Sequence, residues 1–576
     1  MTKLIFDIET DGLNPSVVWC IAVQIEGQPW NTKFFGPREV YNFPEWLIGQ
    51  GITTLIGHNI ISFDIPVLEK LLHFKWKGEV EDTLVMSRLD NPSRKGGHSL
   101  NAWGEKLELL KGNFNKWDEY SEEMKEYCIQ DVKVTAKVYS LLSQQNINPK
   151  AFKLEQEVAY LMNQQKENGW QFDTMKAISL LADLKQEMFK AEDEVREVFI
   201  PIPIFKPTKF PERPYTQDGE ISSALLNQLD KLSFFHEEKG WGHYIAPEFN
   251  LGSRQQIAKQ LVHFGWEPTE FTEKGATIVS EKILEDVDFH EGKLIAKYLM
   301  LQKRLAMVSS WVDAIDFEDR IHGNINSCGA VTGRMTHSKP NLAQVPSSSS
   351  PYGMECRSLF KVNKGYKLVG CDAASLELRM LAHYMNDEEY TKEVSDGDIH
   401  TANQMAAGLE SRDKAKTFIY AFLYGAGDRK IGEIVGGSNK EGKTLKTNFL
   451  NNTPALKDLR ERITKLSTKG TIEGLDGRKL HIRSSHAALN TLFQSAGAIV
   501  MKKALLILNS NAKKHRIDYR FVGNIHDEIQ TEVREDQAKF FGEIAVASIK
   551  EAGEFYGLNC KLDGEFKVGA TWAETH

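Results

Sequence analysis

The sequence predicts a multidomain protein of the α/β class, and three observations indicate this fold class. A chain of 576 residues is too long for a single hydrophobic core. Strand-like and helix-like runs alternate near the N-terminus, and they give way to long stretches of helical periodicity. Farther along, the stretch GNIHDEIQT has the alternating apolar positions of a half-buried hairpin. We therefore expect several domains that combine sheets with helices.

The composition is typical of a soluble globular protein, with 41% apolar and 26% charged residues. The net charge of −8 argues against a surface that binds nucleic acid everywhere, but it is compatible with a basic cleft. Six scattered cysteines without a CxxC pair predict neither a zinc site nor a disulfide framework. The sequence has no signal peptide and no apolar run of 18 residues, so we expect a cytoplasmic protein without a membrane span.

Residues 1–148 predict a compact α/β domain, because strands such as KLIFDIE alternate with helices such as FDIPVLEKLL. Residues 149–325 are mainly helical in pattern. Within them, residues 200–249 begin with a cluster of prolines that excludes a regular helix or a central strand and marks an insertion. From residue 326 onward, strands and helices are mixed.

The N-terminal domain contains acids in an order that could bind metal ions. In IFDIET, Asp7 and Glu9 stand two apart on a predicted strand, so both side chains leave the same face. Asp64 follows at a strand-to-helix passage, and Tyr127 and Asp131 stand one helical turn apart. Such a set can hold two divalent cations, activate a water and stabilise the leaving oxygen of a phosphodiester. Each acid alone would be a solvated surface carboxylate, so the prediction depends on their order.

The ordered set D-x-E, N-x4-D and Y-x3-D resembles the proofreading 3'-to-5' exonucleases of the four-acid, one-tyrosine type. This resemblance implies an RNase H-like domain in which the four acids bind metals and the tyrosine orients the attacking water. No part of the pattern is missing, so the resemblance also implies an active nuclease. A further acid, Asp82, is interpreted as structural.

Two more aspartates are predicted at the ends of buried strands in the C-terminal half. GYKLVGCDAASLELRMLAHYM has the pattern of a buried strand that ends at Asp372, followed by a turn and a helix. A sheet holds such an acid rigidly, which suits a metal ligand. In GNIHDEIQT, Asp527 has a comparable position. The two aspartates are therefore candidates to bind the same pair of cations.

Between these aspartates, SRDKAKTFIYAFLYGAG predicts a helix that ends in glycines. Arg412, Lys416, Tyr420 and Tyr424 recur every fourth residue and form one stripe. The alternative is an amphipathic helix whose basic residues are merely solvated. Basic residues ahead of aromatic ones on the same face suit a triphosphate beside a stacked base, and His400 could add a phosphate donor.

Two other stretches indicate contacts with nucleic acid. CGAVTGRMTHSKPNLAQVP brings Arg334 onto glycine-punctuated backbone that could approach phosphates. HAALNTLFQSAGA places His486, Asn490 and Gln494 at four-residue steps on a predicted helix. Amides at this spacing can contact minor-groove acceptors, whereas the alternative is an ordinary polar helix surface.

The set TGR, DAASLELR, RDKAKTFIYAFLYGAG and HDE resembles the family A DNA polymerases, the DNA polymerase I class, and especially replicative enzymes of short-tailed T-seven-type phages. The resemblance covers nearly the whole chain and is densest in the C-terminal half. It implies a right-hand polymerase with an antiparallel-sheet palm and helical fingers and thumb, after the exonuclease domain. The implied parts are a thumb within residues 149–325, a palm in residues 326–400 and 485–576, and fingers in residues 401–484.

By the same resemblance, Asp372 and Asp527 hold two Mg²⁺ ions, for which Mn²⁺ can substitute. One ion lowers the pKa of the primer 3'-hydroxyl, and the other neutralises the leaving pyrophosphate. Glu528 is implied as a secondary acid near the metals, and His526 as a contact of the primer end.

The resemblance also implies roles around the incoming nucleotide. Arg412, Lys416 and His400 would bind the triphosphate. Tyr420 would stack near the incoming sugar and base, and Glu377 would crowd the 2' position to exclude ribonucleotides. The implied DNA contacts are Tyr424 at the templating position, together with Arg334, His486, Asn490 and Gln494.

The implied partners are a DNA primer-template, dNTPs, a phage helicase-primase and a single-stranded DNA-binding protein. Thioredoxin is not expected, because the region that matches its binding insertion in phage enzymes is short and has few clustered basic residues. The chain starts directly with the exonuclease strand, so another protein is expected to remove primers. If the protein is phage-encoded, the host cytoplasm is its expected location.

The leading interpretation is a DNA-directed DNA polymerase with 3'-to-5' exonuclease activity, and two alternatives remain beside it. A single-subunit RNA polymerase shares a right-hand palm, but Glu377, Tyr420 and the exonuclease set argue against it. A non-catalytic DNA-binding clamp would be a decayed relative, yet every implied metal-binding acid is present. Measuring ribonucleotide incorporation tests the first alternative. Measuring primer extension by Asp372→Ala and Asp527→Ala tests the second.

Overall fold

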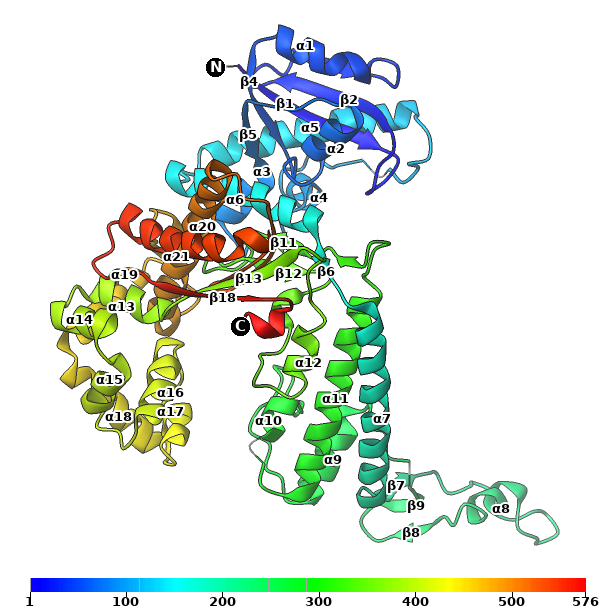
Figure 1. Ribbon diagram of the computed structural model, residues 1–576. Helices are drawn as coiled ribbons and strands as arrows, with labels where there is room; N and C mark the ends of the chain where they lie inside the picture. Colours follow the sequence, from blue (N-terminus) through cyan, green and yellow to red (C-terminus); the bar gives the residue numbers. More distant parts are fainter. Residues whose placement is uncertain (1, 113, 247, 286) are drawn as a thin grey trace. The chain divides into compact units, whose positions relative to one another are not determined.

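The structure is a computed structural model that describes residues 2–112, 114–246, 248–285 and 287–576 (Figure 1). The chain forms two compact units. One unit comprises the chain up to Asp173 together with Ala314–His576, and the other is the continuous segment Thr174–Asp313. The predicted boundaries within the first unit stay predictions, because the N-terminal and C-terminal parts of the chain cluster together there.

The first unit begins with a five-stranded mixed sheet in the order β3-β2-β1-β4-β5 (Figure 1). The central strand β1 pairs antiparallel with β2 and parallel with β4. This arrangement confirms the predicted alternation of strands and helices in an α/β domain. The strands are β1 (Thr2–Thr10), β2 (Val18–Ile25), β3 (Thr32–Phe35), β4 (Ile52–Gly57) and β5 (Glu79–Asp82).

Helices cover both faces of this sheet, and β1 and β2 are therefore buried on both sides. Leu4 and Phe6 belong to the core on the side of α1 and α2, whereas Ile5 belongs to the core on the side of α3, α4 and α5. Since side chains alternate along a strand, Asp7 and Glu9 share the face of Ile5. The helices are α1 (Phe43–Gly49), α2 (Asp64–Leu71), α3 (Thr83–Asp90), α4 (Leu100–Lys106) and α5 (Glu122–Ser143).

Asp82 has the structural role that the sequence predicts. Its carboxylate caps α3 by accepting a hydrogen bond of 2.8 Å from the amide of Leu84. It also accepts hydrogen bonds of 2.8 and 3.2 Å from the amides of Asn59 and Ile61. The buried Asp82 therefore fixes the turn between β4 and α2, which precedes Asp64.

The C-terminal part of the first unit contains a four-stranded antiparallel sheet in the order β16-β17-β13-β18 (Figure 1). The helices α6 and α21 pack against this sheet, and α20 packs against both helices in the same hydrophobic core. The predicted hairpin is confirmed, because only His526 and Asp527 separate β16 from β17. The elements are β13 (Tyr366–Ala373), β16 (Tyr519–Ile525), β17 (Glu528–Arg534), β18 (Gly564–Gly569), α6 (Pro149–Asn168), α20 (Ala488–Lys514) and α21 (Ala538–Phe555).

One helical stretch in the part of the chain that the structure describes is long and apolar enough to cross a membrane. It is Ser485–Lys514, with a mean hydropathy of 1.4 over its most apolar window. However, 72% of that window is buried inside the protein. Its apolar character is therefore explained by its place in the hydrophobic core.

A helical region follows β13, and smaller strands complete the first unit. The helices are α13 (Leu376–Met385), α14 (Glu388–Asp396), α15 (Ile399–Ala407), α16 (Arg412–Leu423), α17 (Asp428–Ile434), α18 (Asn439–Asn452) and α19 (Pro454–Ser467). The short elements are β6 (Trp170–Gln171), β10 (Arg320–Ile321), β11 (Asn324–Asn326), β12 (Thr336–Ser338), α12 (Gly353–Arg357), β14 (Thr471–Glu473) and β15 (Lys479–His481). The predicted helix with the basic and aromatic stripe is α16.

A buried charge network ties α6 to the β14–β15 hairpin and to α20. Glu155 Oε1 accepts hydrogen bonds of 2.7 Å from Arg478 and 2.5 Å from Lys502. Asp476 pairs with the other side of the Arg478 guanidinium at 2.7 Å. Lys502 also donates to the carbonyl of Gly333 at 2.6 Å, which holds the residue before Arg334. The network therefore fixes the backbone of the TGR stretch.

Replacing Glu155 by Ala is expected to lower the free energy of unfolding by about 3–5 kcal/mol, because it leaves two buried cations without their shared partner. Urea titration followed by circular dichroism measures the change. Glu157→Ala is the matched control on the same helix, since Glu157 is half exposed in its ion pair with Lys153. A loss of stability in Glu155→Ala no larger than in Glu157→Ala would show that the network is not stabilising.

The second unit is built on a pair of long helices, α7 (Thr174–Val198) and α11 (His290–Val312). Between α7 and α9 lies the predicted insertion, in which β7 is an edge strand of a three-stranded sheet. The edge position agrees with the expectation that the prolines exclude a central strand. The remaining elements are β7 (Ile204–Pro207), α8 (Ser223–Leu229), β8 (Phe234–His236), β9 (Gly240–Ile245), α9 (Arg254–His263) and α10 (Glu281–Glu285).

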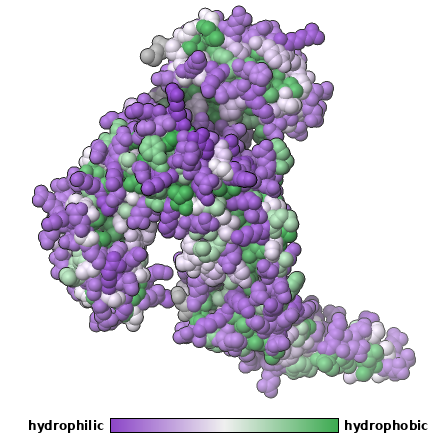
Figure 2. All heavy atoms as spheres, viewed as in Figure 1, coloured by the Kyte–Doolittle hydropathy of each residue, from purple (hydrophilic) through white to green (hydrophobic). Residues whose placement is uncertain are grey.

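Apolar side chains reach the surface of this insertion, as Figure 2 shows around β7, β8, β9 and α8. Leu232 is 82% exposed and Phe235 is 70% exposed. Inside the insertion, Phe205 packs against Phe234 and Tyr244 with ring centres 5.9 and 5.4 Å apart. The insertion therefore has a partly exposed aromatic cluster, and single apolar side chains lie among polar ones on its surface.

Candidate active sites

The structure brings the four predicted acids of the N-terminal domain together. Asp7 and Glu9 project from β1, Asp64 begins α2, and Asp131 lies on α5. Burial raises the pKa of Glu9 to about 8, with a further contribution from Asp131. Burial likewise raises the pKa of Asp7, to which Glu9, Asp131 and Asp64 add. The four carboxylates therefore repel one another in one buried site, as expected for groups that share a cation.

The residues of this site fit a divalent cation. Glu9 Oε1 and Asp131 Oδ1 are buried and find no hydrogen-bond partner among the residues that the structure describes. Ligand atoms of Asp7, Glu9 and Cys128 all lie within 4.8 Å of one another. Asp64 and Asp131 do not belong to this group of three, but their charges help to raise the pKa of Asp7. Buried carboxylate oxygens without partners are what a cation would satisfy.

Two residues of this site are missing from the sequence-based prediction. Cys128 follows Tyr127 on α5, and its thiol lies 3.5 Å from the carbonyl oxygen of Asp7. Lys111 comes from the loop after α4 and forms an ion pair with Asp131. The Lys111 ammonium also lies 4.6 Å from the centre of the Tyr127 ring. Neither residue belongs to a motif of fixed spacing. Their position in the site is therefore seen only in the folded structure.

The sheet register places Asp372 next to the His526–Asp527 turn. Asp372 is the register partner of Glu528, and the amide of Ala373 donates to the carbonyl of Asp527 at 3.4 Å. Partial burial, then Asp527 and Glu528, raise the pKa of Asp372 to about 7. Burial also raises the pKa of Asp527. Two carboxylates at this position fit Mg²⁺, which takes its other ligands from water and substrate phosphates.

Glu528 differs from these two aspartates because its oxygens are already engaged. Trp572 donates to Oε1 at 2.7 Å, His576 lies 3.0 Å from Oε2, and Gln530 donates a short hydrogen bond. Burial alone would raise the pKa of Glu528, but the hydrogen bonds from His576 and Gln530 outweigh it, and the pKa is lowered. The carboxylate of Glu528 is thus held beside the two aspartates by Trp572, His576 and Gln530.

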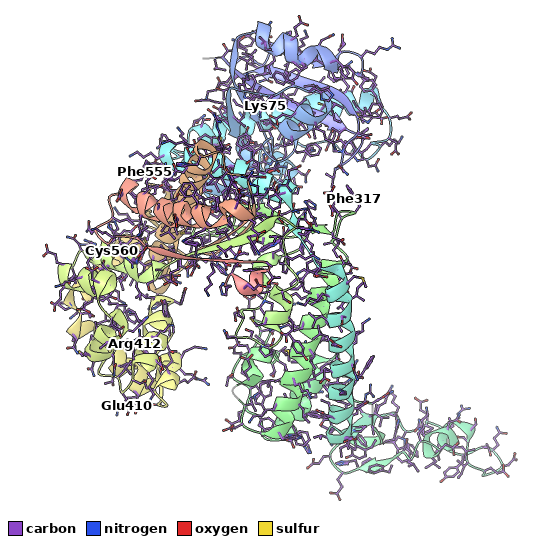
Figure 3. The ribbon with its side chains drawn as sticks, in the orientation of Figure 1. Lys75, Phe317, Glu410, Arg412, Phe555 and Cys560 are labelled. Atoms are coloured by element: carbon purple, nitrogen blue, oxygen red, sulfur yellow. The ribbon has the colours of Figure 1, made fainter. Side chains whose placement is uncertain are left out.

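The predicted stripe lies along α16 and its C-terminal cap. Arg412 is the first residue of the helix, labelled in Figure 3, and it pairs with Asp398 at 2.8 Å. Lys416 is exposed, and Tyr420 is half-buried with its ring centre 6.1 Å from that of His400. Burial, Arg412 and Lys416 lower the pKa of His400. These residues therefore form a positive surface that suits a triphosphate.

Glu377 on α13 is hydrogen-bonded to two other residues that have predicted functions. Its Oε1 accepts a hydrogen bond of 3.0 Å from the hydroxyl of Tyr424 and one of 3.1 Å from Arg334. Burial, and then the charge of Glu377, raise the pKa of Tyr424 to about 12. The structure thus joins the residue expected to exclude ribonucleotides to two expected DNA contacts.

The prediction that His486, Asn490 and Gln494 lie on one helix is wrong for His486. α20 begins at Ala488, so His486 lies in the preceding 3-10 turn Ser485–Ala487 and is exposed. Asn490 and Gln494 lie on the helix and are half-buried. A helix has no intrahelical partners for its first amide groups, and here a tighter turn carries the chain into it.

His526 occupies the first position of the β16–β17 turn with φ of 60°. A two-residue hairpin turn favours a positive φ at this position, which is the physical reason for the conformation. The side chain of His526 is exposed, beside the aspartate that follows it. It lies close enough to His337 to help burial lower the pKa of that residue to about 4.

Comparisons with known proteins bear on these sites. Residues 224–574 match the family model of DNA polymerase family A. The chain is 36% identical to the DNA-directed DNA polymerase of Enterobacteria phage T3 and 35% identical to that of Escherichia phage T7. Each of these two comparisons covers 91% of this chain and 92% of the relative. The POL domain of Pol1 from M. smegmatis, solved with a DNA primer-template and dNTP, has a TM-score of 0.77 at 17% identity, covering 100% of this chain and 96% of that chain.

The fold and the family match define the class of protein: this chain belongs to DNA polymerase family A. Within the family, it is similar to the polymerases of the T3 and T7 phages over nearly its whole length. The resemblance that the motifs indicate is therefore confirmed, and so is the polymerase fold class. Membership in a family of DNA polymerases argues against the single-subunit RNA polymerase alternative.

Proposed function

We propose that this protein extends a primer 3'-hydroxyl with dNTPs on a DNA template, and that it proofreads by 3'-to-5' exonuclease activity. The observation that carries the proposal is the presence of two separate groups of neighbouring carboxylates in one family A chain. One group is built on β1, α2 and α5, and the other on β13 and the β16–β17 turn. Two functions at separate sites would explain why the chain builds two such groups on different elements.

In the polymerase site, Asp372 and Asp527 would hold two Mg²⁺ ions, with Mn²⁺ as a substitute. These ions supply charge neutralisation for the attacking 3'-oxygen and the leaving pyrophosphate. Arg412, Lys416 and His400 would bind the triphosphate, so Arg412 would exchange its pairing with Asp398 for phosphate oxygens.

The residues around the sugar and the template would select the substrate. Glu377, held by Arg334 and Tyr424, would present a fixed carboxylate against a 2'-hydroxyl. Tyr420 would stack near the incoming sugar. The other proposed DNA contacts are His486, Asn490, Gln494 and His526. A fixed acceptor that crowds the 2' position would favour deoxynucleotides by steric exclusion.

In the exonuclease site, Asp7, Glu9, Asp64 and Asp131 would hold the metals, and Tyr127 would orient the attacking water. Metal ions there supply an activated water and stabilise the leaving 3'-oxygen. The Tyr127 ring is fixed by Phe114 and Trp117, whose ring centres lie 5.6 and 5.9 Å away. A hydroxyl held in this way can present a constant hydrogen bond to a water.

The proposed partners are a DNA primer-template, dNTPs, a helicase-primase and a single-stranded DNA-binding protein, and the proposed location is the cytoplasm. We do not propose thioredoxin as a partner. Primer extension and primer degradation, measured with the wild type and with knockouts of each carboxylate group, test the proposed pair of activities.

Tyr420→Phe is expected to raise discrimination against dideoxynucleotides by about tenfold or more, because the hydroxyl would no longer substitute for the missing 3'-hydroxyl hydrogen bond. The ratio of dideoxynucleotide to deoxynucleotide incorporation by single-nucleotide extension measures it. Tyr384→Phe on α13 serves as a control for removing a buried tyrosine hydroxyl elsewhere in the same unit. An unchanged ratio in Tyr420→Phe would remove Tyr420 from the nucleotide site.

A further inference from the structure

We propose that Lys111 is a positioning residue of the exonuclease site. Its ammonium group holds Asp131 Oδ2 and the ring of Tyr127, and its charge opposes binding of a divalent cation at Asp131 Oδ1. The same ammonium group serves the phosphate of the bound strand. This inference rests on the proposed exonuclease function, and it identifies a residue that orients two members of that site.

The contacts of Lys111 place its charge inside the site. The ammonium group forms an ion pair with Asp131, whose side chain is only 3% exposed. It lies 4.6 Å from the centre of the Tyr127 ring, within the range of a cation–π interaction. One side chain therefore contacts both α5 residues of the predicted motif.

The loop that carries Lys111 is built to hold it there. Gln130 on α5 donates to the carbonyl of Leu110 at 3.0 Å, and the amide of Leu109 donates to the carbonyl of Gly104 at 3.0 Å. Farther along the loop, Trp19 on β2 donates to the carbonyl of Trp117 at 2.9 Å. The two hydrogen bonds before Lys111 therefore tie its immediate neighbours to α4 and α5.

The charge of Lys111 acts on the whole acidic group. Its ammonium opposes the rise in the pKa of Asp7, Glu9, Asp64 and Asp131. Four carboxylates in one buried site would otherwise repel one another without compensation. The single charge of Lys111 therefore reduces the repulsion among these four carboxylates.

The same cation opposes metal binding by charge repulsion, because Lys111 pairs with one oxygen of Asp131, Oδ2, while the other, Oδ1, is left for a metal ion. The ammonium lies beside Tyr127, where the scissile phosphate would lie. It can then donate a charge-assisted hydrogen bond to a phosphate oxygen. Removing the charge should thus strengthen metal binding while slowing degradation, a combination that a merely structural lysine would not produce.

The test uses the full chain carrying Asp372→Ala and Asp527→Ala, so that the polymerase site contributes no metal binding. Mn²⁺ binding is titrated calorimetrically for this protein and for the same protein with Lys111→Met, Lys111→Gln or Lys111→Arg. Binding that persists after Asp7→Ala is added is subtracted. Lys116→Met is the matched control, since Lys116 is an exposed lysine in the same loop.

We expect Lys111→Met and Lys111→Gln to lower the Mn²⁺ dissociation constant by about tenfold, the effect of removing one competing charge. Degradation of a single-stranded primer at saturating Mn²⁺ should fall by about a hundredfold, as for loss of one phosphate-stabilising donor. Lys111→Arg should retain wild-type metal affinity and most of the degradation rate, and Lys116→Met should match the wild type in both.

Unchanged or weaker Mn²⁺ binding in the two neutral variants would overturn the proposal, whatever their degradation rate. Primer extension by the Lys111 variants with an intact polymerase site shows that they fold. If the wild type does not degrade primers, the proposed exonuclease function fails, but the titration still decides whether Lys111 competes with the metal. The two failures are therefore distinguishable.

Discussion

Replacing Asp372 or Asp527 by Ala is expected to lower the rate of primer extension by about three orders of magnitude or more, since a bound metal contributes several kcal/mol to phosphoryl transfer. Each aspartate would supply ligand oxygens that the neighbouring Glu528 cannot replace, because Trp572, His576 and Gln530 occupy them. Single-turnover extension of a labelled primer with one dNTP measures the loss.

Glu551→Ala is the matched control for this experiment, because Glu551 is an exposed carboxylate on α21. It should extend primers at the wild-type rate. Degradation of the primer by the Asp372 and Asp527 variants should also stay within about twofold of the wild type, since surface and remote changes rarely couple to a distant site. Wild-type extension by either aspartate variant would remove that aspartate from the polymerase site, and a wild type that extends no primer would favour the non-catalytic clamp.

Replacing Asp7 by Ala is expected to lower primer degradation by about three orders of magnitude, while extension of a matched primer stays unchanged. Asp7 is central to the buried group, where its ligand atoms lie within 4.8 Å of those of Glu9 and Cys128. The loss of labelled full-length primer in the absence of dNTPs measures the effect.

Glu126→Ala is the control for Asp7→Ala, because Glu126 is an exposed carboxylate next to Tyr127 on α5. It should degrade primers as the wild type does. Equal degradation by Asp7→Ala and the wild type would mean that the N-terminal acids do not form a nuclease site. Equal loss of extension and degradation would instead mean that the two sites are not separate.

Much of both sites could be predicted from the sequence because their acids stand in strongly periodic elements. The alternation along β1 places Asp7 and Glu9 on one face, and the buried pattern of β13 carries Asp372 to the end of a strand. The hairpin turn at His526 and Asp527 follows from apolar positions on either side. Local periodicity thus determines which way these side chains point.

Contacts made by loops and by distant segments could not be predicted in this way. Lys111 reaches Asp131 from an irregular loop, and no spacing rule relates the two positions. The resemblance implies Glu528 as a secondary acid near the metals, but its partners Trp572 and His576 come from a segment 44 and 48 residues later. Such partners depend on how the chain returns to the sheet, which local patterns do not encode.

The position of His486 shows the limit of periodicity at the ends of elements. Its four-residue spacing to Asn490 and Gln494 suggests one continuous helix, yet the regular helix begins at Ala488. The first turn of a helix has no preceding carbonyl groups to bond to, so a 3-10 turn can replace it without disturbing the pattern. Spacing therefore predicts a shared face better than it predicts a boundary.

The central claim is that one chain extends primers at one carboxylate group and removes nucleotides at another. The most direct measurement is a time course with a labelled primer whose 3'-terminal nucleotide is mismatched, in the presence of Mg²⁺ and all four dNTPs. We predict that the wild type removes the mismatch before extending, that Asp7→Ala leaves the mismatch in place, and that Asp372→Ala only shortens the primer. Mismatch removal by Asp7→Ala, or extension by Asp372→Ala, would contradict the claim.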